Sequence, residues 1–65
     1  MQLVINGQPR EADAENLAEL LVELQLEASH VAVELNQAIV ERDQFINTRL
    51  NDQDRLEVIQ FVGGG

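Results

Sequence analysis

The sequence contains one apolar stripe with helical spacing, and this stripe limits the fold that so short a chain can adopt. Four leucines occur at positions i, i+3, i+4 and i+7, which lie on one face of an α-helix; they are Leu17, Leu20, Leu21 and Leu24. Asn16 suits the N-cap, and Glu19 follows three residues later, as in a capping box. The spacing predicts a helix over 16–24. With 65 residues in total, one helix and a few strands must share a single core.

An acidic row runs along this predicted helix. Glu19, Glu23 and Glu27 recur every four residues, and like charges at this spacing weaken a helix slightly if Glu27 is still helical. We interpret the row as a solvated face, with a docking surface as the alternative.

Residues 1–11 have the pattern of a β-hairpin. Met1, Leu3 and Ile5 occupy alternate positions, which is the period-two signal of a strand, and Asn6-Gly7 follows. This dipeptide favours the positive φ angles that a two-residue hairpin turn requires. Residues 8–11 are therefore expected to return as a second strand. Because its proline has no N–H to donate, this strand is expected at an edge of the sheet.

A third strand is predicted where Val31, Val33 and Leu35 alternate with less apolar residues. This alternation indicates one buried face. After a brief turn, Ile39 and Val40 start a short apolar piece.

The segment after this piece is expected to be irregular. Residues 41–48 are polar apart from Phe45 and Ile46, so a loop or a single helical turn is predicted. Residues 51–54 are rich in turn-forming Asn and Asp and precede a last strand over 55–62.

The order of elements predicts an α+β chain with β-grasp architecture. It reads strand, hairpin, strand, helix, strand, irregular segment, strand, with one helix packed across a mixed sheet. The first and last strands are expected side by side at the sheet centre. We expect a β-grasp domain over 1–60 and a flexible, Gly-rich C-terminal tail over 61–65.

The last strand is apolar on both faces. Side chains alternate along a strand, so Leu56 and Val58 point one way while Ile59 and Phe61 point the other. One face must meet the helix, which leaves the opposite face with apolar side chains near the tail. With the outward-facing Val4, Ile59 and Phe61 are candidates for a partner patch. Scattered surface apolar residues are an equally open interpretation.

The C-terminal motif is the most distinctive feature for function. It reads Phe61-Val62-Gly63-Gly64-Gly65. Glycine has no Cβ, so another backbone can approach it closely. A peptide that threads a narrow enzyme channel to present its α-carboxylate needs this property, which makes Val62, Gly63 and Gly64 candidates for threading and Gly65 for the reacting end. A frayed terminus is the alternative.

Charge and missing residue types exclude several kinds of chemistry. The net charge of −8 argues against a nucleic acid partner, since phosphate binding requires clustered Lys and Arg, and favours a basic protein surface. Without cysteine, the chain has no disulfide, cysteine zinc site or thiol nucleophile. Without lysine, copies cannot be linked through lysine isopeptide bonds.

Targeting and metal signals are also missing from the sequence. No positively charged leader is present, and no apolar stretch approaches the roughly 20 residues that span a bilayer. We therefore expect a cytoplasmic protein without a membrane partner. His30 has no cysteine or second histidine nearby and is expected to be a surface or strand-flanking residue.

Residue groups along nearly the whole chain match one known pattern. The groups are Met1-Gln2-Leu3 with Asn6-Gly7, Leu20-Leu21, Val31-Ala32-Val33-Glu34-Leu35-Asn36, Ile39-Val40 with Arg42 and Phe45, Asp52-Gln53-Asp54, and Phe61-Val62-Gly63-Gly64-Gly65. On these residues the chain resembles the ubiquitin-like sulfur carriers, and most closely the ThiS family of thiamin biosynthesis. Members often have proline where Glu41 stands, and often end in two glycines rather than three.

The resemblance implies a protein co-substrate rather than an enzyme, with no bound cofactor. A ThiF-type, E1-like adenylyltransferase would use ATP and Mg²⁺ to convert the Gly65 carboxylate into an acyl adenylate. Sulfur from a persulfide donor would then replace AMP and leave a thiocarboxylate. The carrier would deliver this sulfur to a ThiG-type thiazole synthase. Only Gly64 and Gly65 carry over for activation and transfer, with Val62 and Gly63 as the rest of the tail.

Three alternatives remain at this point. A small subunit of molybdopterin synthase, of the MoaD type, uses the same thiocarboxylate chemistry. A ubiquitin-like protein modifier would transfer its acyl group to a substrate lysine. A plain binding module would leave the tail without a role.

Overall fold

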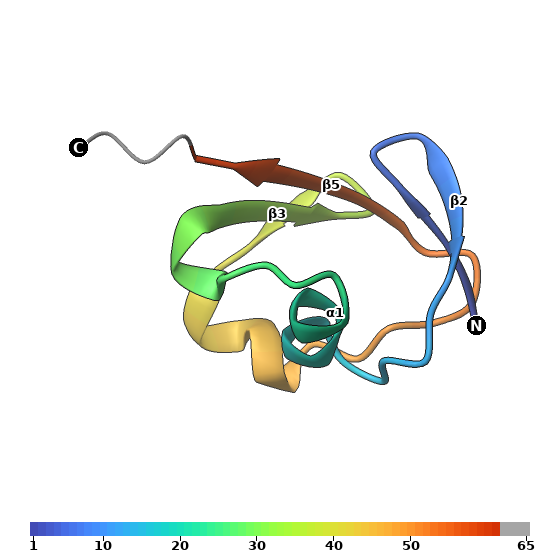
Figure 1. Cartoon of the computed structure of the whole chain (residues 1–65), viewed down its shortest axis with the longest axis horizontal. Helices are drawn as coiled ribbons and strands as arrows, with labels where there is room; N and C mark the ends of the chain where they lie inside the picture. The colour runs from blue at the N-terminus through green and yellow to red at the C-terminus, as the bar shows by residue number, and fades with distance from the viewer. Residues whose placement is uncertain (62–65) are drawn as a thin grey trace.

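The computed structural model describes residues 1–61, which form one five-stranded sheet with a single α-helix across one face (Figure 1). The strands lie in the order β2-β1-β5-β3-β4. The elements are β1 (Gln2–Ile5), β2 (Gln8–Glu11), α1 (Leu17–Glu23), the 3₁₀ helix η1 (Ala28–His30), β3 (Val31–Leu35), β4 (Ala38–Val40), the 3₁₀ helix η2 (Arg42–Asn47) and β5 (Arg55–Gln60). This arrangement confirms the predicted α+β, β-grasp fold.

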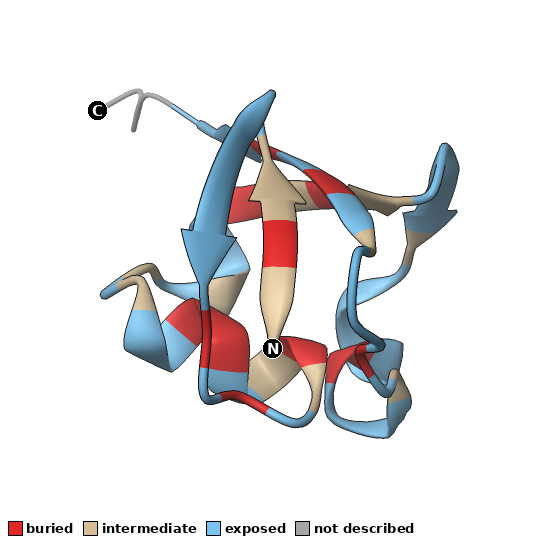
Figure 2. Cartoon of the chain, turned by 90° about the vertical axis from the view of Figure 1, so that its right-hand side faces the viewer, coloured by how far each residue is buried: buried red, intermediate tan, exposed pale blue. Residues whose placement is uncertain are grey.

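The pairing of the strands also matches the prediction. β1 pairs with β2 in an antiparallel hairpin and with β5 in parallel, which makes the sheet mixed and puts the first and last strands side by side. β2 lies at an edge and is exposed along its length (Figure 2). The predicted tail falls outside the described residues from Val62 onward, so its predicted flexibility is untested.

One strand, β4, was not predicted from the sequence. Only a short apolar piece was expected there, whereas Ala38–Val40 pairs with β3 as an antiparallel edge strand. Asn36 and Gln37 take φ angles of 49° and 73°, and two positive φ angles close a two-residue hairpin. Glutamine is not a usual residue for such a turn, so the sequence signal was weak.

Helix α1 is fixed at its start by two side chains. Asn16 is the N-cap, and its Oδ1 accepts from the Glu19 N–H at 2.8 Å. The Glu19 carboxylate reaches back to the Glu15 N–H at 2.9 Å, one residue beyond the partner that a capping box uses. The first bond satisfies an N–H group that the first turn leaves without a helical partner, and the second ties the residue before the N-cap to the helix. The predicted N-terminus is confirmed.

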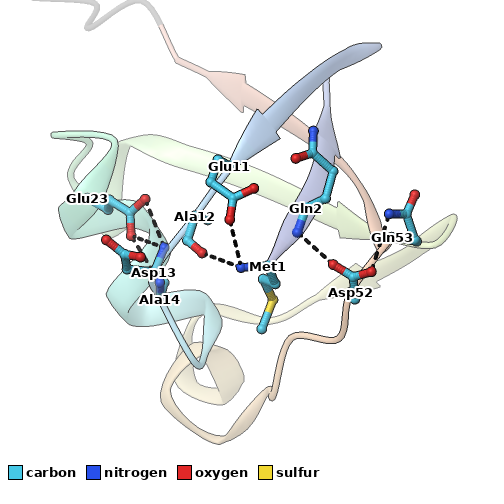
Figure 3. Close-up of polar contacts among 9 residues, drawn as sticks. All are labelled: Met1, Gln2, Glu11, Ala12, Asp13, Ala14, Glu23, Asp52 and Gln53. Carbon is cyan, nitrogen blue, oxygen red and sulfur yellow. Dashed lines mark hydrogen bonds and ion pairs between the residues drawn. The ribbon is translucent and has the colours of Figure 1, made fainter.

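The glutamates of the acidic row are all exposed, and one of them also makes hydrogen bonds within the fold. α1 ends at Glu23, so Glu27 is not part of the helix. The Glu23 carboxylate accepts from the Asp13 N–H at 3.1 Å and the Ala14 N–H at 3.0 Å (Figure 3). The interpretation as a solvated face agrees with the exposure of all three glutamates, and Glu23 in addition ties the end of α1 to the segment that enters the helix.

The core lies between the sheet and α1. The sheet contributes Leu3, Val33, Leu56 and Val58, and all are buried. They meet the buried leucines of the helix stripe, which are Leu17, Leu20 and Leu21. η2 covers one side of this core with Phe45. Apolar burial on this one face of the sheet leaves the opposite face open.

A side-chain clasp joins the loop before β5 to the start of β1 (Figure 3). The Gln2 N–H donates to Asp52 Oδ1 at 2.7 Å, and the Gln53 N–H donates to the Gln2 carbonyl at 2.6 Å. Gln53 Nε2 also donates to Asp52 Oδ2 at 3.3 Å. The hydrogen bond from Gln2, and then that from Gln53, lowers the pKa of Asp52 below its ordinary value of 3.8.

This clasp predicts a pH-dependent contribution to stability. A carboxylate with a lowered pKa in the folded state stabilises the protein above its unfolded pKa, and this contribution is lost as the pH falls through the folded pKa. Asp52→Ala should therefore lower the urea midpoint at neutral pH. The gap from the parent protein should shrink as the pH falls below 3.8.

Asp13→Ala is the matched control, because it removes one exposed carboxylate that accepts no hydrogen bond from residues 1–61. Equal losses in the two variants, or a gap that does not change with pH, would contradict a role for Asp52 in the clasp.

Candidate functional site

The predicted tail follows β5, the strand at the centre of the sheet (Figure 1). β3 pairs with β5 over its whole length, from Leu56 to Gln60. One residue further on, the Phe61 N–H donates to the His30 carbonyl at 2.8 Å. The base of the tail is thus hydrogen-bonded into the sheet. Phe61, the first residue of the predicted tail, is therefore held in place. The remaining tail residues lie outside the described part of the chain; they are Val62, Gly63, Gly64 and Gly65.

Asn6 supports β5 from the other side, where β1 ends. The hairpin turn gives Asn6 and Gly7 φ angles of 51° and 80°, and the chain turns away from β5 there. The Asn6 side chain continues the pairing in place of the backbone. Its Oδ1 accepts from the Val58 N–H at 2.7 Å, and its Nδ2 donates to the Val58 carbonyl at 3.1 Å. Sequence reasoning identified Asn6 only as a turn residue.

The open face of the sheet carries the predicted partner patch. Alternation along β5 places Ile59 and Phe61 on this face, where they are 56% and 55% exposed. Ala32 is paired with Ile59 and shares its face, and Val4 lies half-buried on β1. The structure thus brings the three predicted residues to one face of the sheet.

Sequence reasoning missed Ile39 on this face. Ile39 pairs with Glu34 across β3 and β4 and is 73% exposed. We call the set Val4, Ala32, Ile39, Ile59 and Phe61 the open-face patch. The Asn36-Gln37 turn fixes the position of Ile39, so identifying that turn would have assigned this residue from the sequence.

Two carboxylates face each other beside the patch. Glu34 and Glu57 are direct cross-strand partners on β3 and β5, and like charges in this arrangement repel. Neither carboxylate is within ion-pair distance of an arginine in the part of the chain that the structure describes. The open face therefore combines apolar side chains with negative charge, which suits a basic, partly apolar protein surface.

A concave surface also lies on the helix side of the molecule. A groove between α1 and η2 is lined by Leu21, Val22, Leu26, Phe45 and Ile46, among others. Val22 and Ile46 are exposed there. α1 covers the sheet face opposite the open-face patch, so this groove is not continuous with the base of the tail.

The described residues show neither a metal-binding cluster nor a membrane-spanning helix. Among residues 1–61, no group of three or more His, Asp or Glu side chains is placed to hold a metal ion. His30 is exposed at the end of η1, as predicted. No helix in the described range is long and apolar enough to cross a membrane, and cytoplasmic localisation stays a prediction.

Comparison with known proteins gives one consistent result. The model of the ThiS family matches residues 3–65. A crystal structure of the thiamine biosynthesis protein ThiS from Geobacter metallireducens superposes with a TM-score of 0.83, at 43% identity and with full coverage of both chains. The sulfur carrier protein ThiS of Bacillus subtilis is 38% identical over 53 residues, which cover 82% of this chain and 80% of that protein.

A longer protein also contains a similar segment. A thiazole synthase of Paramagnetospirillum magneticum is 44% identical over 66 residues, and the match covers all of this chain. The chain spans only 20% of the length of that protein. Since the family model covers nearly every residue and the fold agrees with that of a ThiS protein, the chain belongs to the ThiS family.

Proposed function

We propose that the protein is a sulfur carrier for thiamin biosynthesis, whose C-terminal Gly65 is converted to a thiocarboxylate. The observation that carries this proposal is the match to the ThiS family, which extends through Gly65. The anchoring of Phe61 to His30 supports it, because a tail that begins at the end of a central strand has a defined starting point. The protein acts as a co-substrate, and the catalysis belongs to its partners.

The chemistry requires activation because a carboxylate is a poor electrophile. An oxygen of the Gly65 carboxylate attacks the α-phosphorus of Mg-ATP, and pyrophosphate leaves. The terminal sulfur of a persulfide then attacks the acyl carbon, and AMP leaves. Cleavage of the resulting S–S bond by a second thiol releases the thiocarboxylate. These steps need a ThiF-type adenylyltransferase and a persulfide donor, since the chain has no cysteine.

Thiazole synthase is the proposed acceptor of the sulfur. Support comes from the thiazole synthase of Paramagnetospirillum magneticum, which contains a segment similar to this whole chain. The open-face patch, together with Glu34 and Glu57, is the proposed docking surface for the activating enzyme.

The thiocarboxylate itself provides the main test. Incubation with the activating enzyme, Mg-ATP and a persulfide donor should raise the intact mass by the difference between sulfur and oxygen. Fragmentation should place the change on Gly65. Removal of residues 63–65 should abolish the shift while preserving the fold. A shift that survives this truncation, or that maps elsewhere, would contradict the sulfur-carrier proposal.

Passage of the tail through a narrow channel predicts a requirement for glycine at position 64. Gly64→Ala adds a Cβ close to the reacting end, so adenylation should slow while the urea midpoint stays unchanged. ATP/pyrophosphate exchange with the activating enzyme measures the rate. An undiminished exchange rate would remove the threading interpretation of Val62, Gly63 and Gly64.

The docking surface predicts a difference between two exposed apolar residues. Phe61→Ser should weaken binding to the activating enzyme, whereas Val22→Ser, on the opposite side of the molecule, should not. Both side chains are more than half exposed, so neither substitution should change stability by more than about 0.5 kcal/mol. Calorimetric titration at several salt concentrations tests both parts, because screening should weaken binding to a basic surface. Equal affinities for the two variants would exclude the open-face patch.

A further inference from the structure

The backbone groups of β5 that point toward β1 are hydrogen-bonded along the first part of the strand and, within residues 1–61, unpaired at its end. The Phe61 N–H donates to the His30 carbonyl, and the Asn36 N–H donates to the Arg55 carbonyl. Hydrogen-bonded positions alternate in an antiparallel ladder, so the odd-numbered residues 55–61 direct their backbone groups toward β3. The even-numbered residues direct theirs toward β1.

Three of these even-numbered positions have partners on the β1 side. The Asp54 carbonyl accepts from the Val4 N–H, and the Leu56 carbonyl accepts from the Asn6 N–H, both at 2.9 Å. Val58 is bonded through both its N–H and its carbonyl to the Asn6 side chain. The side-chain amide of Asn6 is therefore the last group of β1 and its turn that forms a hydrogen bond with β5.

Gln60 is the next even-numbered position, and its backbone has no such partner. It lies opposite Val31 at a non-hydrogen-bonded pair of the β3 ladder. No group in residues 1–61 bonds to its N–H or carbonyl on the β1 side. The first half of β5 is thus a central strand, and its end is an edge strand with a free donor and acceptor.

The other two edges of the sheet differ from this one. On β2 the outward position next to the turn is Pro9, which has no N–H. On β4 the Leu35–Ala38 pair closes the two-residue turn, so Ile39 directs its backbone groups away from β3. That edge lies two strands away from β5. Within the described range 1–61, Gln60 is the free backbone position next to the predicted tail.

We propose that the backbone of Gln60 pairs with an extended segment of thiazole synthase, which adds a short strand beyond the end of β1. Free main-chain N–H and carbonyl groups on a strand are recognised by another strand. The proposal deepens the function proposed above and rests on it. The synthase is the chosen partner because a protein named thiazole synthase contains a segment similar to this whole chain. Strand addition at Gln60 would hold the tail base in line with the active site that accepts its sulfur.

Amide hydrogen exchange measures this pairing directly. In the ¹⁵N-labelled free protein, the Gln60 amide should exchange quickly and the Ile59 amide slowly, because only Ile59 donates to β3. Saturation with the thiazole synthase of the same genome should slow Gln60 by roughly tenfold or more. The Ile39 amide, on the distant edge, should not change.

A proline substitution removes the donor and tests its contribution to binding. Gln60→Pro deletes an N–H for which residues 1–61 supply no acceptor, and it keeps residue 59 in the extended conformation that β5 already has. Gln60→Ala keeps the N–H and is the matched control. Gln60→Pro should weaken binding to the synthase roughly three- to tenfold relative to Gln60→Ala, as expected for one backbone hydrogen bond. If Gln60→Pro does not fold, the exchange measurement on the parent protein decides alone.

The outcomes separate this inference from the function on which it rests. A complex with the synthase in which Gln60 still exchanges quickly, or equal affinities for folded Gln60→Pro and Gln60→Ala, would overturn strand addition and leave the sulfur-carrier role intact. Protection of Gln60 only with the activating enzyme, or only at high concentration of the carrier alone, would also overturn it. Absence of any complex with the synthase would reject the proposed acceptor and this inference together.

Discussion

The parallel contact between β1 and β5 is the constraint on which the rest of the structure depends. It joins residues far apart in sequence, since the Asn6 side chain and the Val58 backbone are 52 positions apart. Parallel strands cannot be connected by a tight turn, so the chain between them must cross over the sheet. α1 lies in that connection and covers one face. The same contact places β5 in the sheet centre and fixes where the tail begins.

Central placement gives the two faces of β5 different roles. Leu56 and Val58 pack into the core, and truncating a buried leucine such as Leu56 typically costs about 2–5 kcal/mol. Ile59 and Phe61 remain exposed on the other face. The strand that leads to the tail therefore cannot shift without disturbing the core. A partner that binds the exposed face meets a rigid surface directly beside the tail.

Features that add little to the stability of the isolated domain gather around the open face. Glu34 and Glu57 repel each other across the strands, and Ile39 and Phe61 expose apolar area. The Gln60 donor and acceptor have no partner on the β1 side among residues 1–61. The proposed activating enzyme would neutralise the charges and cover the apolar area, and the proposed segment of thiazole synthase would pair with Gln60. The base of the tail thus shares one region with the groups that are most available for binding.

Local patterns in the sequence determined the helix, the first hairpin, the strand parity of β3 and β5, and the glycine end that identifies the tail. These features depend on residues within one or two turns of each other, as with Asn16 and Glu19. Only the tertiary structure decided that Glu23 caps residues 13 and 14, that Asp52 holds Gln2, and that Asn6 completes the edge of β5. It also decided that, within residues 1–61, the pairing of β5 on its β1 side ends before Gln60. Each of these depends on which distant backbone groups are left without partners once the sheet has formed, and no local pattern contains that information.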